Sequence, residues 1–284
     1  MERNKLKFLQ VGLGSMGKRR IRNLLWHKIP KEHIFGFDLS AERGKEAEEK
    51  YGIKTFTDFA EAVAVVRPDV YVISTPPNLH HDYFLHAAKL KKHFFVEVGT
   101  TDAGYDELMP LLDDSFVAAP SCTFRYFPAI KKIKEVVNAG QIGQVLAFQY
   151  HLGQYLPDWH PWEDYRQVYF AQKESGACRE MFVFELIWLT DILQAQVAAV
   201  TGFTGKVSDL DMPADDIYVA TIGLQNGIVG TMMIEVLART PFRTLRLIGS
   251  TGVLEWEWQN YQIRVFQIAT KEWKIIDIPK GPQE

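Results

Sequence analysis

The chain has 284 residues, 47% of them hydrophobic, which is enough to bury one large core or two modest ones. Its formal net charge of −3 and pI near 6.3 exclude a general attraction to nucleic acid or to an anionic membrane surface. We find no stretch of the roughly 20 apolar residues that a membrane span needs, no signal-peptide pattern and no metal-like spacing of the two cysteines, Cys122 and Cys178, so we expect a cytoplasmic protein without a metal site.

A short apolar strand over residues 8–11 leads into a glycine-rich turn and then a basic, helix-forming stretch. The turn fits G-x-G-x-x-G: the first glycine allows a tight turn, the second lets a pyrophosphate approach the backbone, and the third lets the helix pack closely on the strand. The turn residues predicted to bind the cofactor are Gly12, Gly14, Ser15, Met16 and Gly17. This order predicts a dinucleotide site; the alternative is a glycine-rich turn in an unrelated α/β protein.

Asp38 ends the next apolar run, residues 34–37, and lies 21 residues after Gly17 (38 − 17 = 21). A carboxylate at this spacing is typical of the group that holds a ribose 2′-hydroxyl. Because it would repel a 2′-phosphate, it favours NAD, whereas Arg43 lies close enough in the sequence to leave NADP open. The basic run Lys18–Arg20 is interpreted as a solvated helix face, with a phosphate contact by one of its residues as the alternative.

The first 120 residues alternate strand and helix with short links, which predicts a doubly wound parallel sheet. The run 70–74 is apolar throughout and rich in β-branched and aromatic residues, as expected of a strand buried on both faces. The predicted strands are residues 8–11, 34–37, 53–56, 70–74, 94–98 and 116–119, and the predicted helices beyond the glycine turn are residues 41–51, 59–66, 83–90 and 105–112.

Near Pro120 the pattern changes, because a run of strands replaces the alternation. Helices are predicted at 129–138 and 176–193, an aromatic loop at 155–169, and strands at 145–153, 217–224, 228–236, 244–249, 253–258, 262–268 and 273–278. Gln225, Asn226 and Gly227 form a strong hairpin signal. We therefore predict an α/β Rossmann domain that binds NAD(P) at residues 1–120, followed by an α+β domain with a large, mostly antiparallel open sheet at residues 121–284.

In the second domain Leu254, Trp256 and Trp258 alternate with Val253, Glu255 and Glu257, so one face of that strand carries large aromatic side chains. This face is predicted to be either a core face under a helix or a sheet face buried in a homodimer. We expect a homodimer that forms through this sheet.

The order of the parts resembles the Gfo/Idh/MocA (glucose–fructose oxidoreductase/inositol dehydrogenase) family over nearly the whole chain. The segment 74–80, Ser-Thr-Pro-Pro-Asn-Leu-His, is similar to the T-P-x-x-x-H segment that borders the nicotinamide end of the cofactor in this family, and residues 95–97, Phe-Val-Glu, are similar to the strand before its E-K-P motif. The resemblance implies cofactor contacts from Ser74, Thr75, Pro76, His80 and Glu97. Their positions at predicted strand ends agree with ligand binding outside the carboxyl ends of parallel strands.

The resemblance continues into the second half through Arg125, Pro128 and Gly140-Gln141-Ile142-Gly143, and through residues 159–166, which resemble a loop of members tied to surface-sugar metabolism. It implies a cofactor on the first domain, a substrate on the sheet of the second, and hydride transfer at a carbon of a sugar-like substrate. The candidate substrate contacts are Arg125, Trp159, Asp164, Tyr165 and Arg166.

The chain departs from the family at two catalytic positions. Val98 stands where the family has the lysine of E-K-P, and Phe184 stands where it has the catalytic histidine, while Glu180 keeps the acidic position one turn before Phe184. A positioned acid or base contributes about 10²–10⁴ in rate, so its loss would cripple ordinary hydride transfer from an alcohol. Glu180 is the candidate base; the other titratable groups considered are His160, Tyr165 and Tyr169.

Three functions remain open at this point. The first is an NAD(P)-dependent oxidoreductase of a sugar or sugar derivative, with a non-standard catalytic site. The second is a dinucleotide-binding sensor or regulatory protein without catalysis, and the third is a reductase whose substrate takes its proton from water.

Overall fold

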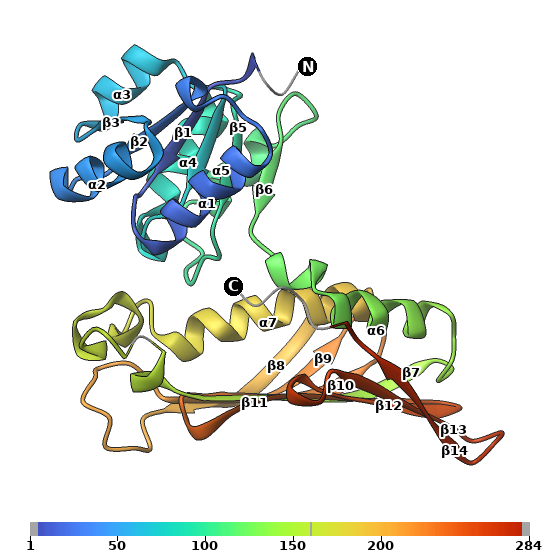
Figure 1. Ribbon diagram of the computed structural model, residues 1–284. Coiled ribbons are helices and arrows are strands. Elements are labelled where there is room, and N and C mark those ends of the chain that lie inside the picture. The colour runs from blue at the N-terminus through green and yellow to red at the C-terminus, as the bar shows by residue number, and fades with distance from the viewer. Residues whose placement is uncertain (1–4, 160, 280–284) are drawn as a thin grey trace. The chain divides into compact units, whose positions relative to one another are not determined.

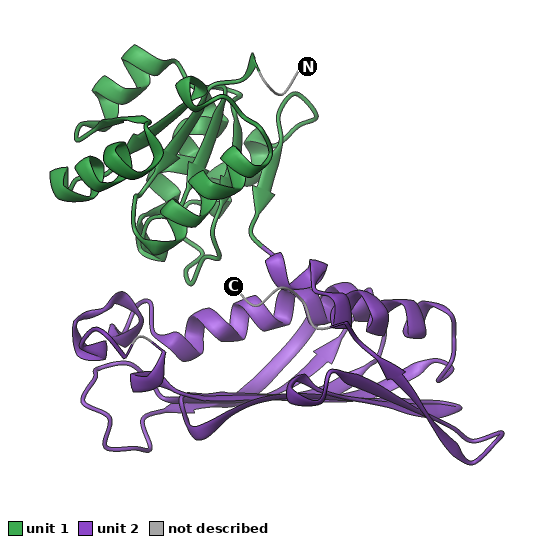
Figure 2. Cartoon of the chain, in the orientation of Figure 1, with its two compact units in different colours: residues 1–121 green, residues 122–284 purple. Residues whose placement is uncertain are grey.

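The computed structural model describes residues 5–159 and 161–279 of the chain. The chain divides into two compact units, residues 1–121 and residues 122–284 (Figures 1 and 2), where the sequence analysis placed a boundary after residue 120. Each unit has its own hydrophobic core.

The first unit is a six-stranded parallel sheet in the order β3-β2-β1-β4-β5-β6. Its strands are β1 (Phe8–Val11), β2 (Ile34–Phe37), β3 (Lys54–Phe56), β4 (Val70–Ile73), β5 (His93–Val96) and β6 (Ala118–Pro120). The order reverses between β1 and β4, which creates the topological switch point where open α/β sheets bind ligands. The predicted doubly wound sheet is confirmed.

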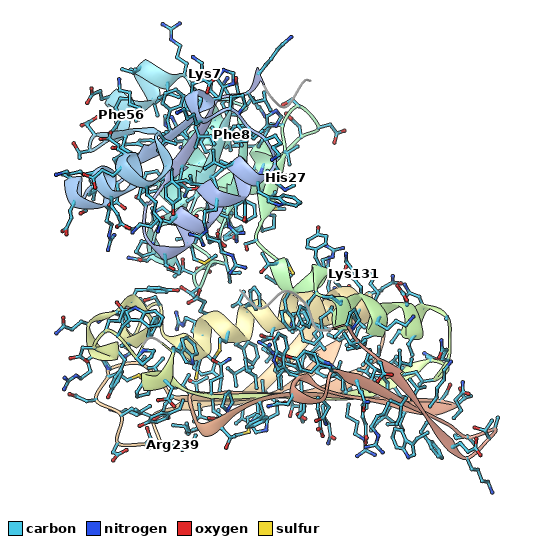
Figure 3. The ribbon with its side chains drawn as sticks, in the orientation of Figure 1. Lys7, Phe8, His27, Phe56, Lys131 and Arg239 are labelled. Carbon is cyan, nitrogen blue, oxygen red and sulfur yellow. The ribbon has the colours of Figure 1, made fainter. Side chains whose placement is uncertain are left out.

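Helices cover both faces of this sheet (Figure 1), as two separate core clusters show. The helices are α1 (Ser15–Trp26), α2 (Ala41–Tyr51), α3 (Phe59–Val66), α4 (His80–Lys89) and α5 (Tyr105–Leu108), with short 3-10 helices η2 (Lys31–His33), η3 (Pro77–Leu79) and η4 (Met109–Leu111). One core contains Ile21 of α1 and Phe8, which Figure 3 labels, and the other contains Phe84 of α4. The predicted helix 105–112 was too long, since Pro110 lacks an N–H and the chain continues as η4.

The second unit is an eight-stranded sheet in the order β14-β13-β12-β11-β7-β10-β9-β8. Its strands are β7 (Val145–Tyr155), β8 (Val197–Gly205), β9 (Ile217–Leu224), β10 (Val229–Glu235), β11 (Leu237–Gly249), β12 (Gly252–Glu257), β13 (Gln262–Gln267) and β14 (Glu272–Asp277). The predicted hairpin joins β9 and β10 in antiparallel register. In the described residues β10 pairs with β7 in parallel, whereas the other neighbouring strands are antiparallel, so the prediction of a mostly antiparallel sheet is confirmed.

Two helices, α6 (Pro128–Asn138) and α7 (Ala177–Leu193), cover one face of the second sheet, as Figure 1 shows. Short 3-10 helices lie before and between them and after β12: η5 (Thr123–Tyr126), η6 (Leu156–Asp158), η7 (Tyr165–Gln167), η8 (Tyr169–Ala171) and η9 (Trp258–Asn260). Trp256 is only 2% exposed, and its ring centroid lies 6.2 Å from that of Trp188 on α7. The aromatic face of β12 is therefore a core face, which confirms the first of the two alternatives; the second, a dimer interface on this face, was wrong because α7 already covers it.

A buried charged network joins three elements of this core. The Arg243 Nη2 atom on β11 lies 2.7 Å from Glu185 Oε1 on α7, and Arg243 Nε donates to the Tyr150 hydroxyl of β7 at 2.9 Å. Tyr150 donates in turn to Glu185 Oε2 at 2.6 Å, and burial raises the pKa of Tyr150 well above its usual range, so it stays a neutral donor. Because the carboxylate of Glu185 is 1% exposed, its charge has to be balanced by Arg243.

We predict that Glu185→Gln lowers the free energy of unfolding by about 3–5 kcal/mol, because it leaves a buried guanidinium without a counter-charge. Urea unfolding followed by tryptophan fluorescence measures this, since six of the seven tryptophans lie in the second unit. The control is Glu135→Gln, which breaks an exposed ion pair with Lys132 on α6 and should cost no more than about 1 kcal/mol. Equal losses in the two variants would contradict the assignment.

Candidate functional site

The turn between β1 and α1 has the geometry that the glycine spacing predicts. Gly12 has a φ of +87°, in the left-handed region, and a Cβ there would lie 2.6 Å from the carbonyl oxygen of Ser74. A Cβ on Gly17 would lie 1.9 Å from the carbonyl oxygen of Gly12, so the start of α1 can approach β1 this closely only without a side chain. Gly14 faces open space, with nothing within 4 Å of its Cβ position. A ligand can therefore reach the backbone at Gly14.

Asp38 follows β2 and is 8% exposed. Its Oδ2 accepts a hydrogen bond from the Leu13 amide at 2.8 Å, and its Oδ1 accepts one from the Ser40 amide at 2.9 Å. The exposed guanidinium of Arg43 lies 3.7 Å from Oδ2. The carboxylate is thus held at the end of β2 beside the glycine turn, and each oxygen keeps acceptor capacity for a ribose hydroxyl.

The segment after β4 carries buried polar atoms that lack partners. Ser74 Oγ, Thr75 Oγ1 and His80 Nδ1 have no hydrogen-bond partner among the described residues. His80 Nε2 lies 2.9 Å from the Thr75 carbonyl oxygen, and burial lowers the pKa of this histidine. The neutral ring therefore carries its proton on Nε2, since a carbonyl only accepts, and Nδ1 is an unsatisfied acceptor. Buried polar atoms without partners are costly, so a bound polar ligand would stabilise this segment.

Glu97 follows β5 and is paired with α1. Arg20 Nε and Nη2 lie 2.6 and 2.9 Å from the two carboxylate oxygens, and the guanidinium also lies 4.8 Å from the centre of the Phe95 ring. The interpretation of the basic run as a solvated face was wrong for Arg20, which is 8% exposed, whereas Lys18 pairs with Glu46 at the surface. The predicted cofactor contact of Glu97 stays a prediction, and Val98 beside it is buried.

These groups fit a dinucleotide. The glycine turn, Asp38 and the segment 74–80 follow β1, β2 and β4, which are neighbours in the sheet and meet at its carboxyl edge. A diphosphate would lie against Gly14 and the N-terminus of α1, with Ser15 and Met16 in the first turn, and a ribose would lie against Asp38. Arg20 also contacts this group of residues through Glu97, and Gln10 contacts it through the Gly12 carbonyl. Gln10 was not predicted to belong to the site, and its signal in the sequence is an amide inside an otherwise apolar strand.

In the second unit Glu180 lies in the first turn of α7, half-buried, and accepts a hydrogen bond from the Tyr169 hydroxyl at 3.2 Å. Phe184, one turn further along the helix, packs against the core with its ring centroid 6.1 Å from that of Phe124. Phe184 therefore makes an apolar contact with the core, and its correspondence to the family's histidine stays a prediction. The predicted role of Glu180 as a base stays a prediction.

The predicted substrate contacts lie in two separate places. Asp164 and Arg166 bind each other, with Nη2 2.6 Å from Oδ2, and the Tyr165 hydroxyl accepts from the Asp211 amide at 3.0 Å. Trp159 packs on Phe170, and its buried Nε1 has no hydrogen-bond partner among the described residues. His160 lies outside the described residues.

Arg125 lies apart from that loop, because its Nη2 atom is 2.6 Å from Asp191 Oδ1 near the end of α7. Asp191 is 11 residues from Glu180 (191 − 180 = 11), which is about 16 Å along the helix axis. The roles of all five residues in substrate binding stay predictions.

No helix within residues 5–159 and 161–279 is both long and apolar enough to cross a membrane. Over the same ranges no group of three or more histidine, cysteine, aspartate or glutamate side chains is placed to hold a metal ion.

Two family models match successive parts of the chain. Residues 6–108 match an oxidoreductase family with an NAD-binding Rossmann fold, and residues 130–255 match the GFO/IDH/MocA C-terminal domain. The family prediction is confirmed, and the cofactor that the first match gives for this unit is NAD, as predicted.

Two curated relatives match over part of their length. A levoglucosan dehydrogenase from Pseudarthrobacter phenanthrenivorans is 28% identical over 130 residues, which is 43% of this chain and 32% of the relative. The oxidoreductase YrbE of Bacillus subtilis is 28% identical over 138 residues, 47% of this chain and 40% of the relative. The matches thus span about a third to two-fifths of the relatives.

Among solved structures, levoglucosan dehydrogenase in complex with NADH superposes with a TM-score of 0.82 at 19% identity, over 98% of this chain and 80% of that chain. The similarity shows a shared fold across both units.

We predict that alanine substitutions at Gly14 and Gly17 have different effects, one on NADH binding and the other on folding. Gly14→Ala should keep its melting temperature, because its Cβ enters open space, but should weaken NADH binding at least about tenfold by blocking the approach of the diphosphate. Gly17→Ala should fold poorly, because its Cβ would overlap the Gly12 carbonyl. Thermal melts and fluorescence titration with NADH separate these effects. A Gly14→Ala variant that binds NADH normally would refute the proposed diphosphate position.

Burial of His80 predicts a pH dependence of stability. Its folded-state pKa is lowered, so when the pH falls below about 6.5 the unfolded chain takes up a proton that the folded chain resists. This contribution to stability is present above that pH and is lost as the pH falls, by up to about 1.4 kcal/mol per pH unit. His80→Gln should reduce the drop in unfolding free energy between about pH 7.5 and pH 5.5. The exposed His27 (labelled in Figure 3) provides the control His27→Gln, and an equal drop in both variants would exclude His80 as the source.

Proposed function

Because the chain belongs to the Gfo/Idh/MocA family of NAD-binding oxidoreductases, we propose that it transfers a hydride between NAD and a hydroxyl-bearing carbon of a sugar or sugar-derived substrate. The observation that carries the proposal is the open glycine turn at Gly14 beside the oriented carboxylate of Asp38. The name of the levoglucosan dehydrogenase relative supports a sugar-like substrate.

The first unit supplies the residues for the cofactor. The glycine turn would hold the diphosphate, and Asp38 would hold the ribose and favour NAD, with Arg43 as the feature that leaves NADP open. The unsatisfied atoms of Ser74, Thr75 and His80 would meet the nicotinamide end, with Pro76 and Glu97 beside them. When bound, NAD accepts or supplies the hydride.

The second unit supplies the proton chemistry. Oxidation of an alcohol releases a hydride from carbon and a proton from the hydroxyl, so a base has to take that proton. Glu180 is our candidate base, and the Tyr169 hydroxyl, 3.2 Å away, would orient its carboxylate. Trp159, Tyr165, Asp164, Arg166 and Arg125 are the proposed substrate contacts.

A second function is favoured by one specific observation. Val98 is buried and Phe184 packs against the core, and the resemblance implies that these are the two positions that usually handle protons in this family. A sensor or regulatory protein that binds NAD without turnover would need no proton group there. A reductase whose substrate takes its proton from water is the third candidate.

We also propose a homodimer and a cytoplasmic location. The sheet face opposite the helices presents exposed apolar side chains, among them Val219, Val229, Ile248 and Trp273, which share one face by register. Large exposed apolar patches usually mark interaction sites, which supports association through this face.

Fluorescence titration with NADH and NADPH, followed by a screen of sugars, nucleotide sugars and keto-sugars for a change in nicotinamide absorbance, tests the proposal. We expect NADH binding and turnover of a sugar. Tight NADH binding without turnover of any compound would favour the sensor, and no binding of either nucleotide would overturn all three candidate functions.

If turnover is found, Glu180→Gln should lower kcat at least about tenfold, the low end of what a positioned base contributes. Tyr169→Phe should lower kcat by less, since it removes only the group that orients Glu180. The control is Glu135→Gln on the surface of α6, which should leave kcat unchanged. An unaltered kcat in Glu180→Gln would exclude Glu180 as the base.

A further inference from the structure

A glutamine lies inside the central strand of the first unit. Gln10 on β1 is 0% exposed, while the other residues of β1 are apolar. Its neighbours in register are Gly36 on β2 and Val72 on β4, so it lies in the interior of the sheet. A fully buried amide in a parallel strand has to have a hydrogen-bonding reason to be there, because an apolar side chain of the same size would avoid the desolvation cost.

The amide of Gln10 holds the carbonyl groups of the glycine turn. Its Nε2 donates to the carbonyl oxygen of Gly12 at 3.0 Å and to that of Val11 at 3.3 Å. The opposite orientation of the amide would direct Oε1 against two carbonyl oxygens, so the hydrogen bonds determine which way it points. Oε1 has no hydrogen-bond partner among the described residues, which is a cost that these two bonds offset.

The peptide unit between Gly12 and Leu13 is thereby held at both ends. Its carbonyl oxygen accepts from Gln10, and its N–H donates to Asp38 Oδ2 at 2.8 Å. The same carbonyl oxygen is the atom against which Gly17 of α1 packs. One peptide plane therefore connects the strand, the start of the helix and the carboxylate at the end of β2.

We propose that Gln10 is a positioning residue for the dinucleotide: by orienting the Gly12–Leu13 peptide, it couples the diphosphate turn to the carboxylate of Asp38 that would hold the ribose. The proposal rests on the proposed binding of NAD. It assigns Gln10 no contact with the cofactor, so its effect on binding has to pass through this peptide.

Gln10→Met tests the proposal, because methionine has a similar length but no donor. We expect NADH to bind about twofold to tenfold more weakly, the range that one net hydrogen bond spans. The control is Val72→Ala, which removes buried apolar atoms beside Gln10 in register and should lower the melting temperature without changing the Kd of NADH. Both variants are measured by thermal melts and by fluorescence titration well below their melting temperatures.

A double-mutant cycle of Gln10→Met with Asp38→Asn measures how strongly the two side chains are coupled in NADH binding. A purely structural role of Gln10 would give no such coupling. If both side chains act through one peptide, the double variant should bind NADH at least about threefold better than the product of the two single losses predicts. Additive losses, or a Gln10→Met variant that loses stability but binds NADH like the wild type, would make Gln10 an ordinary core residue and overturn the proposal. Failure of the wild type to bind NADH would overturn the proposed function and this assignment with it.

Discussion

The close contact between α1 and the end of β1 is the constraint on which the candidate cofactor site depends. A methyl group on residue 17 would stand 1.9 Å from the Gly12 carbonyl oxygen, so the helix can begin here only because no side chain intervenes. The contact aims the N-terminus of α1 at the place where a diphosphate would lie. The peptide that follows Gly12 donates its N–H to Asp38, so the diphosphate and ribose positions are set by one backbone turn.

Two carboxylates of α7, those of Glu180 and Glu185, have different surroundings in the second unit. Glu185 faces the core, 1% exposed, and its charge is matched by Arg243 and two further hydrogen-bond donors. Glu180, in the first turn, is half-buried and has a tyrosine hydroxyl as a partner. The carboxylate of Glu185 is occupied by a structural ion pair inside the core, whereas that of Glu180 is only half-buried. This difference is why we place the proposed base at Glu180.

The sequence predicted the helices and strands well where a local residue pattern specifies them. It predicted less well the features that depend on contacts between distant residues. The parallel strands, the glycine turn and the hairpin before β10 follow from residue period and spacing. The helix over 105–112 came out shorter because of Pro110, a signal that is visible in the sequence. The sequence did not decide what packs against the Trp256 face of β12, since a helix and a second subunit can both bury an apolar face. In the structure α7 packs against it.

By itself the sequence determined the doubly wound first unit and its glycine turn, because glycine spacing and strand period are local properties. Only the tertiary structure decided which charged and polar side chains bind one another. Arg20 pairs with Glu97 across 77 residues, and Gln10 turns its amide to the Gly12 carbonyl. The physical reason is that the free energy of a buried charged or polar group depends on the partner that folding brings to it, and that partner lies far away in the sequence.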